Sequence, residues 1–357
     1  MSPRPFTNAQ YAGADGPRTI WPSLNDDALH RLFNVSDVLR DGFTLTIAGC
    51  IVGLLIVVPI VARFTPEPTR GDVYKRWRGW LMLVPLILVP ILLGAFWTWL
   101  AVALLAFMAY REFARATGLF RERVVSAAVV LAMLVVYFAT LDHYYAFFVA
   151  LWPLGVSLIT LAGLARDKPH GYLQRTALGV LAFMLFGAGL GHLAYFTNDP
   201  MFRRVLLWII VCVQMNDIFA YTSGKLFGPM TGGKKLAPNT SPNKTIAGAI
   251  GAVVLTTGLT MLLGRWAWTG TTLAGWGHLL VMGVMISLLG QAGDLLLSAI
   301  KRDVGVKDLG HLFPGHGGLL DRFDSLMLVS AALFHYIGYN RGVGLDQLPR
   351  IISYNWF

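Results

Sequence analysis

Long apolar stretches recur along this chain, and they restrict the fold more than any other feature of the sequence. An apolar run of about 20 residues crosses a lipid bilayer as a helix, and only helices or closed barrels satisfy their backbone groups in lipid. The chain is 55% hydrophobic and only 13% charged, whereas soluble domains carry about 25% charged residues. The alternating short strands typical of a barrel are missing from the sequence. We therefore predict an all-α, polytopic integral membrane protein.

The apolar stretches predict about ten transmembrane helices. Their ranges are 43–62, 80–94, 96–110, 124–141, 144–165, 176–196, 205–222, 245–264, 276–300 and 323–340. The second and third divide one continuous apolar run, with a tight hairpin expected at the sequence LLGAFW. A single long tilted helix over 80–110 is the alternative.

The positive charges give an orientation, because Lys and Arg collect in the short loops on the cytoplasmic side of a membrane. With ten spans, 20 of the 29 Lys and Arg fall in one set of alternate loops and 9 in the other. The rich set comprises 63–79, 111–123, 166–175, 223–244 and 301–322. This set is predicted to be cytoplasmic, in a cell (inner or plasma) membrane, with both termini on the opposite side. Merging the second and third spans would move loop 63–79 to the wrong side.

Four regions follow from this count. Residues 1–42 form a polar leader, with an interfacial helix or a disordered segment as its alternatives. Residues 43–200 hold the N-terminal and middle spans, 201–340 hold the charged C-terminal spans, and 341–357 form a short tail.

The net charge of +10 is spread among the loops, without a basic arm or recognition helix, so nucleic acid is not an expected partner. Membrane orientation and contact with anionic membrane lipids account for most of these basic residues.

Acidic residues at membrane depth mark the candidate site, because a carboxylate there normally faces a partner or a water-filled cavity. Asp217 and Asp294 lie near the predicted cytoplasmic ends of their spans, Asp324 opens the last span, and Asp321 is placed one turn earlier, in the loop. One such residue is readily explained as an interhelical ion pair. Four of them at the same ends of three spans favour a site that binds a hard divalent cation.

Helical spacing places further polar groups beside these carboxylates. Asp294, Ser298 and Lys301 share one helix face, and they begin the segment 298–325, where charged residues and glycines interrupt the apolar pattern. Asp217 is expected to share a face with Tyr221 and Lys225 unless the helix ends earlier. Carboxylates for a metal beside ammonium and hydroxyl groups for phosphate oxygens predict a metal–phosphate site.

The loop 223–244 contains four lysines and no acid. Its end, TSPNKT, reads as a helix start, with Ser241 as N-cap and Pro242 at the first helical position. Lys244 and Thr245 would then lie in the first turn, where free N–H groups attract anions. In FPGHGG, glycines allow close approach to a ligand; His316 either donates to a phosphate or caps the turn.

The segment 298–325 resembles the signature of the phosphatidate cytidylyltransferases, also called CDP-diacylglycerol synthases. The match runs from Ser298-x-Ile-Lys-Arg, through Lys307-Asp308, to His316-Gly-Gly-x-x-Asp-Arg-Phe-Asp324. NDIFAYTSGKLFG and SPNKT resemble two further family segments, with Asn243 where the family carries Lys.

The resemblance implies that CTP and phosphatidate give CDP-diacylglycerol and pyrophosphate, with Mg²⁺. It implies metal ligation by Asp294 and Asp321, with Asp217, Asp324 and Lys301 completing the catalytic group. The residues implied in substrate binding are Ser241, Lys244, Thr245, Ser298, Arg302, Lys307, His316, Gly317, Gly318 and Arg322. A homodimer is compatible with the sequence.

Other functions stay open at this stage. A CTP-dependent polyprenol or phytol kinase would use a related membrane architecture to transfer a γ-phosphoryl group to an alcohol. An ion-coupled transporter would use Asp217 and Asp294 as its coupling pair, although transporter sites lie near the bilayer midplane. A CDP-archaeol synthase would carry out the same chemistry on an ether lipid.

Overall fold

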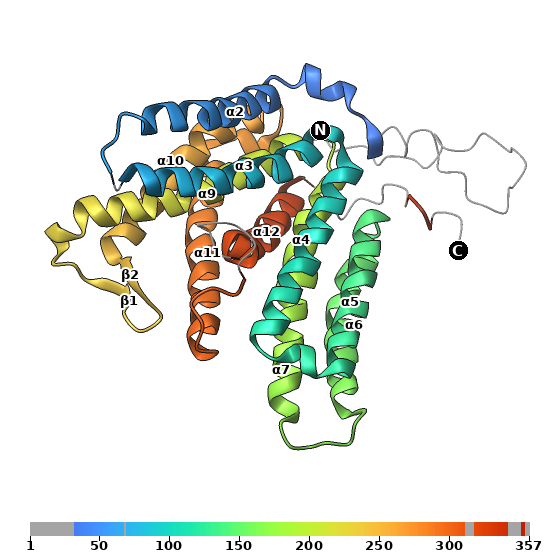
Figure 1. Ribbon diagram of the computed structural model, residues 1–357. Coiled ribbons are helices and arrows are strands. Elements are labelled where there is room, and N and C mark those ends of the chain that lie inside the picture. Colours follow the sequence, from blue (N-terminus) through green and yellow to red (C-terminus); the bar gives the residue numbers. More distant parts are fainter. Residues whose placement is uncertain (1–31, 68, 311–317, 342–350, 354–357) are drawn as a thin grey trace, which may run out of the picture.

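The computed structural model describes residues 32–67, 69–310, 318–341 and 351–353, and its main body is helical (Figure 1). The first half contains α2 (Gly42–Ala62), α3 (Thr69–Leu93), α4 (Ala95–Ala116), α5 (Arg123–Leu141), α6 (Tyr145–Leu164), α7 (Tyr172–Ala182), the π-helical turn Phe183–Gly189 and α8 (Leu190–Tyr195). The second half contains α9 (Phe202–Phe227), β1 (Lys235–Ala237), β2 (Ser241–Thr245), α10 (Ile246–Ala267), α11 (Trp276–Asp303) and α12 (Leu320–Arg341). The all-α prediction is confirmed.

Every predicted span coincides with a helix or, for 176–196, with the continuous run from α7 to α8. In the described part of the chain, eight helices are long and apolar enough to cross a membrane. Helices α4 and α12 fall outside this group; both carry charged residues near an end, such as Arg111, Glu112 and Asp321. The total of ten crossing helices therefore stays a prediction.

The predicted break between the second and third spans is confirmed at Gly94. Helix α3 ends at Leu93 and α4 begins at Ala95, and Gly94 adopts φ +136°, a conformation that favours glycine. The Leu32 carbonyl oxygen would lie 3.1 Å from a Cβ placed at Gly94, so the chain also approaches closely there. In Figure 1, α3 lies across the view and α4 descends from it, so the junction is a corner.

Polar contacts join several segments that are predicted to lie on the same side. On one side, Lys244 pairs with Asp294 and Arg166 with Glu122. These contacts bring loops 111–123 and 166–175 together and place loop 223–244 beside α11, as the prediction requires of these loops.

The other side is held together in the same way. Arg204 pairs with Asp41 at 2.8 Å and Arg341 with Asp199 at 2.8 Å. The buried Asp142 carboxylate accepts hydrogen bonds from the backbone N–H of Ser353 at 2.9 Å and from its hydroxyl at 2.5 Å. Residues 351–353 are thereby bound to the α5–α6 loop, on the side predicted for both termini. Which side faces the cytoplasm stays a prediction.

This arrangement gives a direct topology experiment. A reporter fused after Phe357 is expected to report the non-cytoplasmic side, and one inserted at Gly232 in the 223–244 loop the cytoplasmic side. Gly232 is suitable because it is exposed and a Cβ there would meet nothing within 4 Å. Matching signals from the two fusions would contradict the loop assignment.

The C-terminal helices position the charged residues. Helix α9 packs against α10, α10 against α11, and α11 against α12, while α12 also contacts α4 and α8. Buried polar side chains tie three of these helices together: the Asn216 carboxamide oxygen on α9 accepts from Thr256 on α10 at 3.0 Å and from Ser287 on α11 at 2.6 Å. Asn216 therefore fixes the turn of α9 that carries Asp217.

Candidate active site at the ends of α9, α11 and α12

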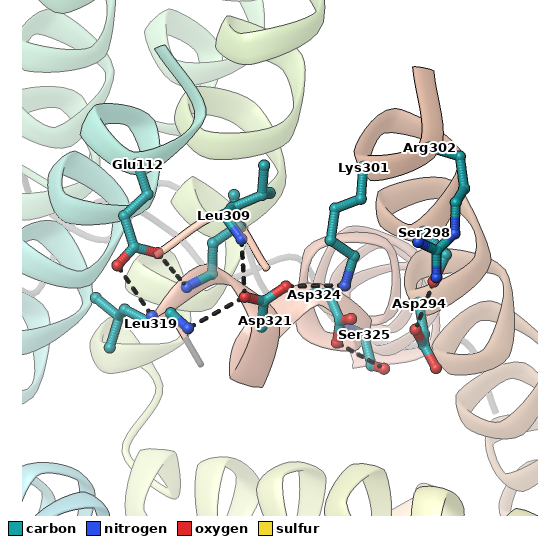
Figure 2. A network of polar contacts seen from close by, with 12 residues as sticks. Glu112, Asp294, Ser298, Lys301, Arg302, Leu309, Leu319, Asp321, Asp324 and Ser325 are labelled. Atoms are coloured by element: carbon teal, nitrogen blue, oxygen red, sulfur yellow. Dashed lines mark hydrogen bonds and ion pairs between the residues drawn. The ribbon is translucent and has the colours of Figure 1, made fainter. Parts of the chain in front are cut away.

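Helix α11 presents the predicted row of polar groups. It is continuous from Trp276 to Asp303, and the Ser298 hydroxyl donates to the Asp294 carboxylate at 3.3 Å (Figure 2). The Lys301 ammonium extends towards α12, where it binds Asp321. The prediction that these side chains share one helix face is confirmed.

The β1–β2 hairpin brings Lys244 to this row. Strand β2 pairs with β1 in an antiparallel manner, and the Lys244 ammonium lies 2.5 Å from the Asp294 carboxylate. The lysine side chain is 23% exposed and the aspartate side chain 28% exposed. A phosphate that enters here can compete with Asp294 for the lysine, because both are anionic ligands of the same ammonium.

The prediction that Ser241 begins a helix is wrong. Residues Ser241–Thr245 form β2, and α10 starts at Ile246 with Thr245 as its N-cap, whose hydroxyl accepts from Gly248 N–H at 3.0 Å. The N-cap of α10 is Thr245 and not Ser241. A Ser-Pro pair is a local N-cap signal, but here the pairing of β2 with β1 decides the conformation. Only Thr245 stands at a helix N-terminus.

Helix α9 also runs further than expected. It continues through Gly224 to Phe227, so the helix does not end before Lys225. Asp217, Tyr221 and Lys225 therefore share a helix face as predicted. The side chains of Tyr221 and Lys225 are exposed.

Asp321 accepts hydrogen bonds from three partners in the described part of the chain. One carboxylate oxygen accepts from Lys301 at 2.8 Å, and the other accepts from the backbone N–H of Leu309 at 3.2 Å and of Gly318 at 3.1 Å (Figure 2). Its placement in a loop is corrected, since α12 begins at Leu320 and Asp321 lies in the first turn. Asp321 thus joins both ends of the segment 310–317 to the last turn of α11.

Glu112 on α4 is a further member of this network that the sequence did not reveal. Its two carboxylate oxygens accept from the N–H groups of Leu319 at 3.1 Å and Leu320 at 2.9 Å (Figure 2). A carboxylate is favoured at a helix N-terminus by the free N–H groups and the helix dipole. The predicted span ended at 110, which placed Glu112 in a loop, whereas α4 continues to Ala116.

Gly310 and Gly318 are fitted against Glu112. A Cβ on Gly310 would lie 2.3 Å from a Glu112 carboxylate oxygen, and one on Gly318 would lie 2.6 Å from the other. Absence of a side chain at both positions therefore allows the carboxylate to reach the α12 N-terminus.

We expect Glu112→Gln to lower activity by at least about tenfold, because a neutral amide weakens charge-assisted hydrogen bonds that contribute about 1.5–3 kcal/mol. Glu122→Gln is the control, since the Glu122 side chain is 40% exposed and lies 4.0 Å from its ion-pair partner Arg166. Steady-state turnover of the two purified variants is the measurement. Equal turnover in Glu112→Gln and wild type would show that the α12 N-terminus needs no carboxylate.

Asp217 and Asp324 complete the group of carboxylates. Asp324 is buried on α12, and its carboxylate accepts from Ser325 N–H at 2.7 Å. Asp217 is accessible on α9. Both are near enough to Asp294 to interact with it electrostatically, and Lys244 and Arg322 act on Asp217 in the same way. The structure thus brings carboxylates from α9, α11 and α12 together.

The remaining predicted residues lie around this group with different degrees of contact. The Arg302 side chain donates to the Thr240 carbonyl at 3.3 Å and so connects α11 with the hairpin. Lys307 is exposed, and Ser241 is half-buried in β2. Gly318 is buried against Asp321 and Glu112. His316 and Gly317 lie outside the described residues.

The donor set is suited to a hard divalent cation, which prefers carboxylate oxygens. In the part of the chain that the structure describes, no group of three His, Cys, Asp or Glu residues is arranged to hold an ion directly. Asp294 and Asp321 bind different lysines here, so one metal shared by both remains a prediction. Asp217 and Asp294 are accessible and adjoin Asp324, so their excess negative charge fits a cation bound between them.

Comparison with known proteins agrees with this geometry. The model of the cytidylyltransferase family matches residues 74–340. An uncharacterized protein, YnbB, of Escherichia coli K12 is 31% identical over 297 residues, which cover 80% of this chain and 95% of that protein.

Two relatives are named phosphatidate cytidylyltransferase. The protein of Staphylococcus saprophyticus is 35% identical over 49% of this chain and 64% of its own length, and that of Brucella melitensis is 41% identical over 38% and 48%. The alignments thus span about half to two thirds of these two proteins. Because the family model covers most of the chain, including all of the charged helix ends described above, the protein is a membrane nucleotidyltransferase that belongs to the cytidylyltransferase family.

Proposed function

We propose that this protein transfers a cytidylyl group from CTP to phosphatidate, giving CDP-diacylglycerol and pyrophosphate. A phosphate oxygen of the lipid forms a bond to the α-phosphorus of CTP, and the bond from that phosphorus to the bridging oxygen of the pyrophosphate group breaks. The observation that carries the proposal is the meeting of Lys244, Lys301 and four aspartate carboxylates from α9, α11 and α12, within a family match.

The basic residues would bind the phosphates of the two anionic substrates. Lys244 and Lys301 are already oriented by Asp294 and Asp321, so little side-chain entropy is lost when phosphate oxygens approach. Arg302, Lys307 and Arg322 supply further positive charge on the same side. Positioning of the two substrates and neutralisation of their phosphate charges would provide most of the catalysis, because both substrates are polyanions that must meet. The attacking phosphate is already ionised and requires no general base.

Mg²⁺ bound by Asp294 with Asp217 or Asp321 would stabilise negative charge on the phosphates. Asp324 is buried on α12, and Asn216, the residue before Asp217 on α9, fixes the position of Asp217 through its bonds to α10 and α11. The active site would face the cytoplasm, where CTP is available, and phosphatidate would approach sideways within the inner leaflet.

The test uses purified protein in detergent with phosphatidate, Mg²⁺ and CTP labelled in the cytosine. We expect label in a lipid product that migrates as CDP-diacylglycerol, together with stoichiometric pyrophosphate. A lipid kinase would instead transfer only label placed in the γ-phosphate. The family assignment argues against an ion-coupled transporter. A parallel assay with an ether-linked archaeal phosphatidate tests whether the protein is a CDP-archaeol synthase. An unlabelled lipid fraction would contradict the proposal.

We expect Lys244→Ala to raise the KM for CTP or for phosphatidate, since the ammonium lies at the site and its backbone belongs to a partly exposed strand. Lys234→Ala is the control, because Lys234 is an exposed lysine of the same loop. Kinetics at limiting concentrations of each substrate distinguish the two. Unchanged KM values for both substrates would remove Lys244 from the site.

A further inference from the structure

A cavity of about 280 Å³ lies beside the charged site, between α3, α4, α9 and α12. Its wall on α4 contains Trp97, Ala101, Leu104, Leu105 and Met108, and it consists almost entirely of apolar side chains. An engineered apolar cavity of about 150 Å³ binds benzene, so this one has room for a substantial length of hydrocarbon.

The cavity is open on the outer surface of the helices. Trp97, Leu104 and Met108 remain 43%, 50% and 46% exposed, although they line it. Helices α3 and α9, which supply other parts of the wall, are both apolar and long enough to cross a membrane. The opening therefore faces hydrocarbon when the protein is in a bilayer, and a chain can pass in from the side.

Helix α12 separates this cavity from the carboxylates. Leu319, Phe323 and Leu326 line the cavity and have the i, i+4, i+7 spacing of one helix face. Asp321 and Asp324 lie on the opposite part of the same turns. A molecule with one end among the charged residues and the other in the cavity would thus pass around the first turn of α12, which Glu112 of α4 contacts (Figure 2).

The length of the cavity matches one leaflet of a membrane. From Trp97 to Met108, α4 rises about 16 Å at about 1.5 Å per residue, and half of a hydrocarbon core of about 30 Å is about 15 Å. One turn beyond Met108, Glu112 binds the α12 N-terminus. The cavity therefore ends at the level of the charged site.

We propose that this cavity holds one acyl chain of the lipid substrate while its phosphate lies at Lys244, Lys301 and the neighbouring carboxylates. The inference rests on the proposed function, and it adds which surface of the protein recognises the lipid tail. The occupant is a substrate hydrocarbon chain and not a bilayer lipid in general, because Leu319 and Phe323, on the turn that carries Asp321, line the cavity.

Photolabelling of the wild-type protein tests the assignment without any substitution. Phosphatidate with a photoreactive group midway along one chain is added to active protein in phosphatidylcholine nanodiscs. We expect crosslinks in Trp97–Met108 or Leu319–Leu326, displaced by excess phosphatidate but not by added phosphatidylcholine. Crosslinks confined to other surfaces, or displaced equally by both lipids, would overturn the proposal even though CDP-diacylglycerol is formed.

A substitution gives an independent readout. Ala101→Phe narrows the cavity, and Ala150→Phe on an exposed position of α6 is the matched control. We expect Ala101→Phe to lower kcat/KM for dipalmitoyl phosphatidate at least about tenfold, the lower end of the effect of one misfit group in an apolar pocket. Turnover of dihexanoyl phosphatidate and the KM for CTP should match those of the control variant.

Equal losses for the long-chain and short-chain substrates would contradict an acyl-chain site. If Ala101→Phe does not fold, judged by its elution and thermal unfolding beside Ala150→Phe, the photolabelling result decides. The wild-type assay separates the two claims: absence of CDP-diacylglycerol from either substrate overturns the proposed function itself, and the acyl-chain assignment with it.

Discussion

Asp294→Asn is expected to lower kcat/KM by at least about a hundredfold, the scale of removing one important electrostatic contact. The amide keeps the shape of the side chain and the hydrogen bond to Ser298, but it leaves Lys244 without its anionic partner. It also removes a charge that a bound Mg²⁺ would require. Steady-state kinetics across a range of Mg²⁺ concentrations is the measurement.

Asp303→Asn provides the control for this variant, since Asp303 is exposed at the end of the same helix. It should retain wild-type turnover and Mg²⁺ dependence. If Asp294→Asn kept most of its Mg²⁺-dependent activity, neither metal binding nor lysine orientation by this carboxylate would matter for catalysis. The double variant with Asp321→Asn should lose little more than either single variant, because residues that act as a unit are not additive.

Asp321→Asn is expected to lower both activity and stability. The Asp321 and Lys301 side chains are only 6% and 14% exposed, and breaking a buried ion pair costs about 3–5 kcal/mol because it leaves one charge unpaired. An amide also offers one oxygen where the carboxylate uses two, so the contacts to Lys301, Leu309 and Gly318 cannot all be kept. Turnover should fall by at least about a hundredfold.

A second substitution separates the two effects. Adding Lys301→Met to Asp321→Asn removes the unpaired charge, so thermal unfolding should recover while turnover stays low. Asp308→Asn, at an exposed position in the same segment, is the control. Recovery of turnover together with stability would show that this ion pair is structural only.

The sequence predicts the helices well because their signal is local. Apolar runs of membrane length locate each helix, and the glycine at position 94 separates two of them. The Lys and Arg distribution groups loop 223–244 with the end of α11, and the ion pair between Lys244 and Asp294 agrees with that grouping. Spacing along one helix also predicts the common face of Asp294, Ser298 and Lys301.

Contacts between distant segments were harder to predict. Glu112 is separated from Leu319 and Leu320 by more than 200 residues, and no local pattern links an acid at the end of α4 to the start of α12. Strand β2 was read as a helix start because its pairing with β1 outweighs the local Ser-Pro signal. In the same way, sequence spacing cannot reveal which lysine each carboxylate binds.

The last helix is pinned at both ends. At its C-terminal end Arg341 binds Asp199, and at its N-terminal end Glu112 and Asp321 join the first turn to α4 and α11. Such a helix cannot move as a piston along its own axis without breaking charged contacts at one end. Exchange of a lipid chain in the proposed acyl-chain cavity is therefore expected to move α3 and the exposed surface of α4, while the carboxylates on α12 keep a constant position along the helix axis.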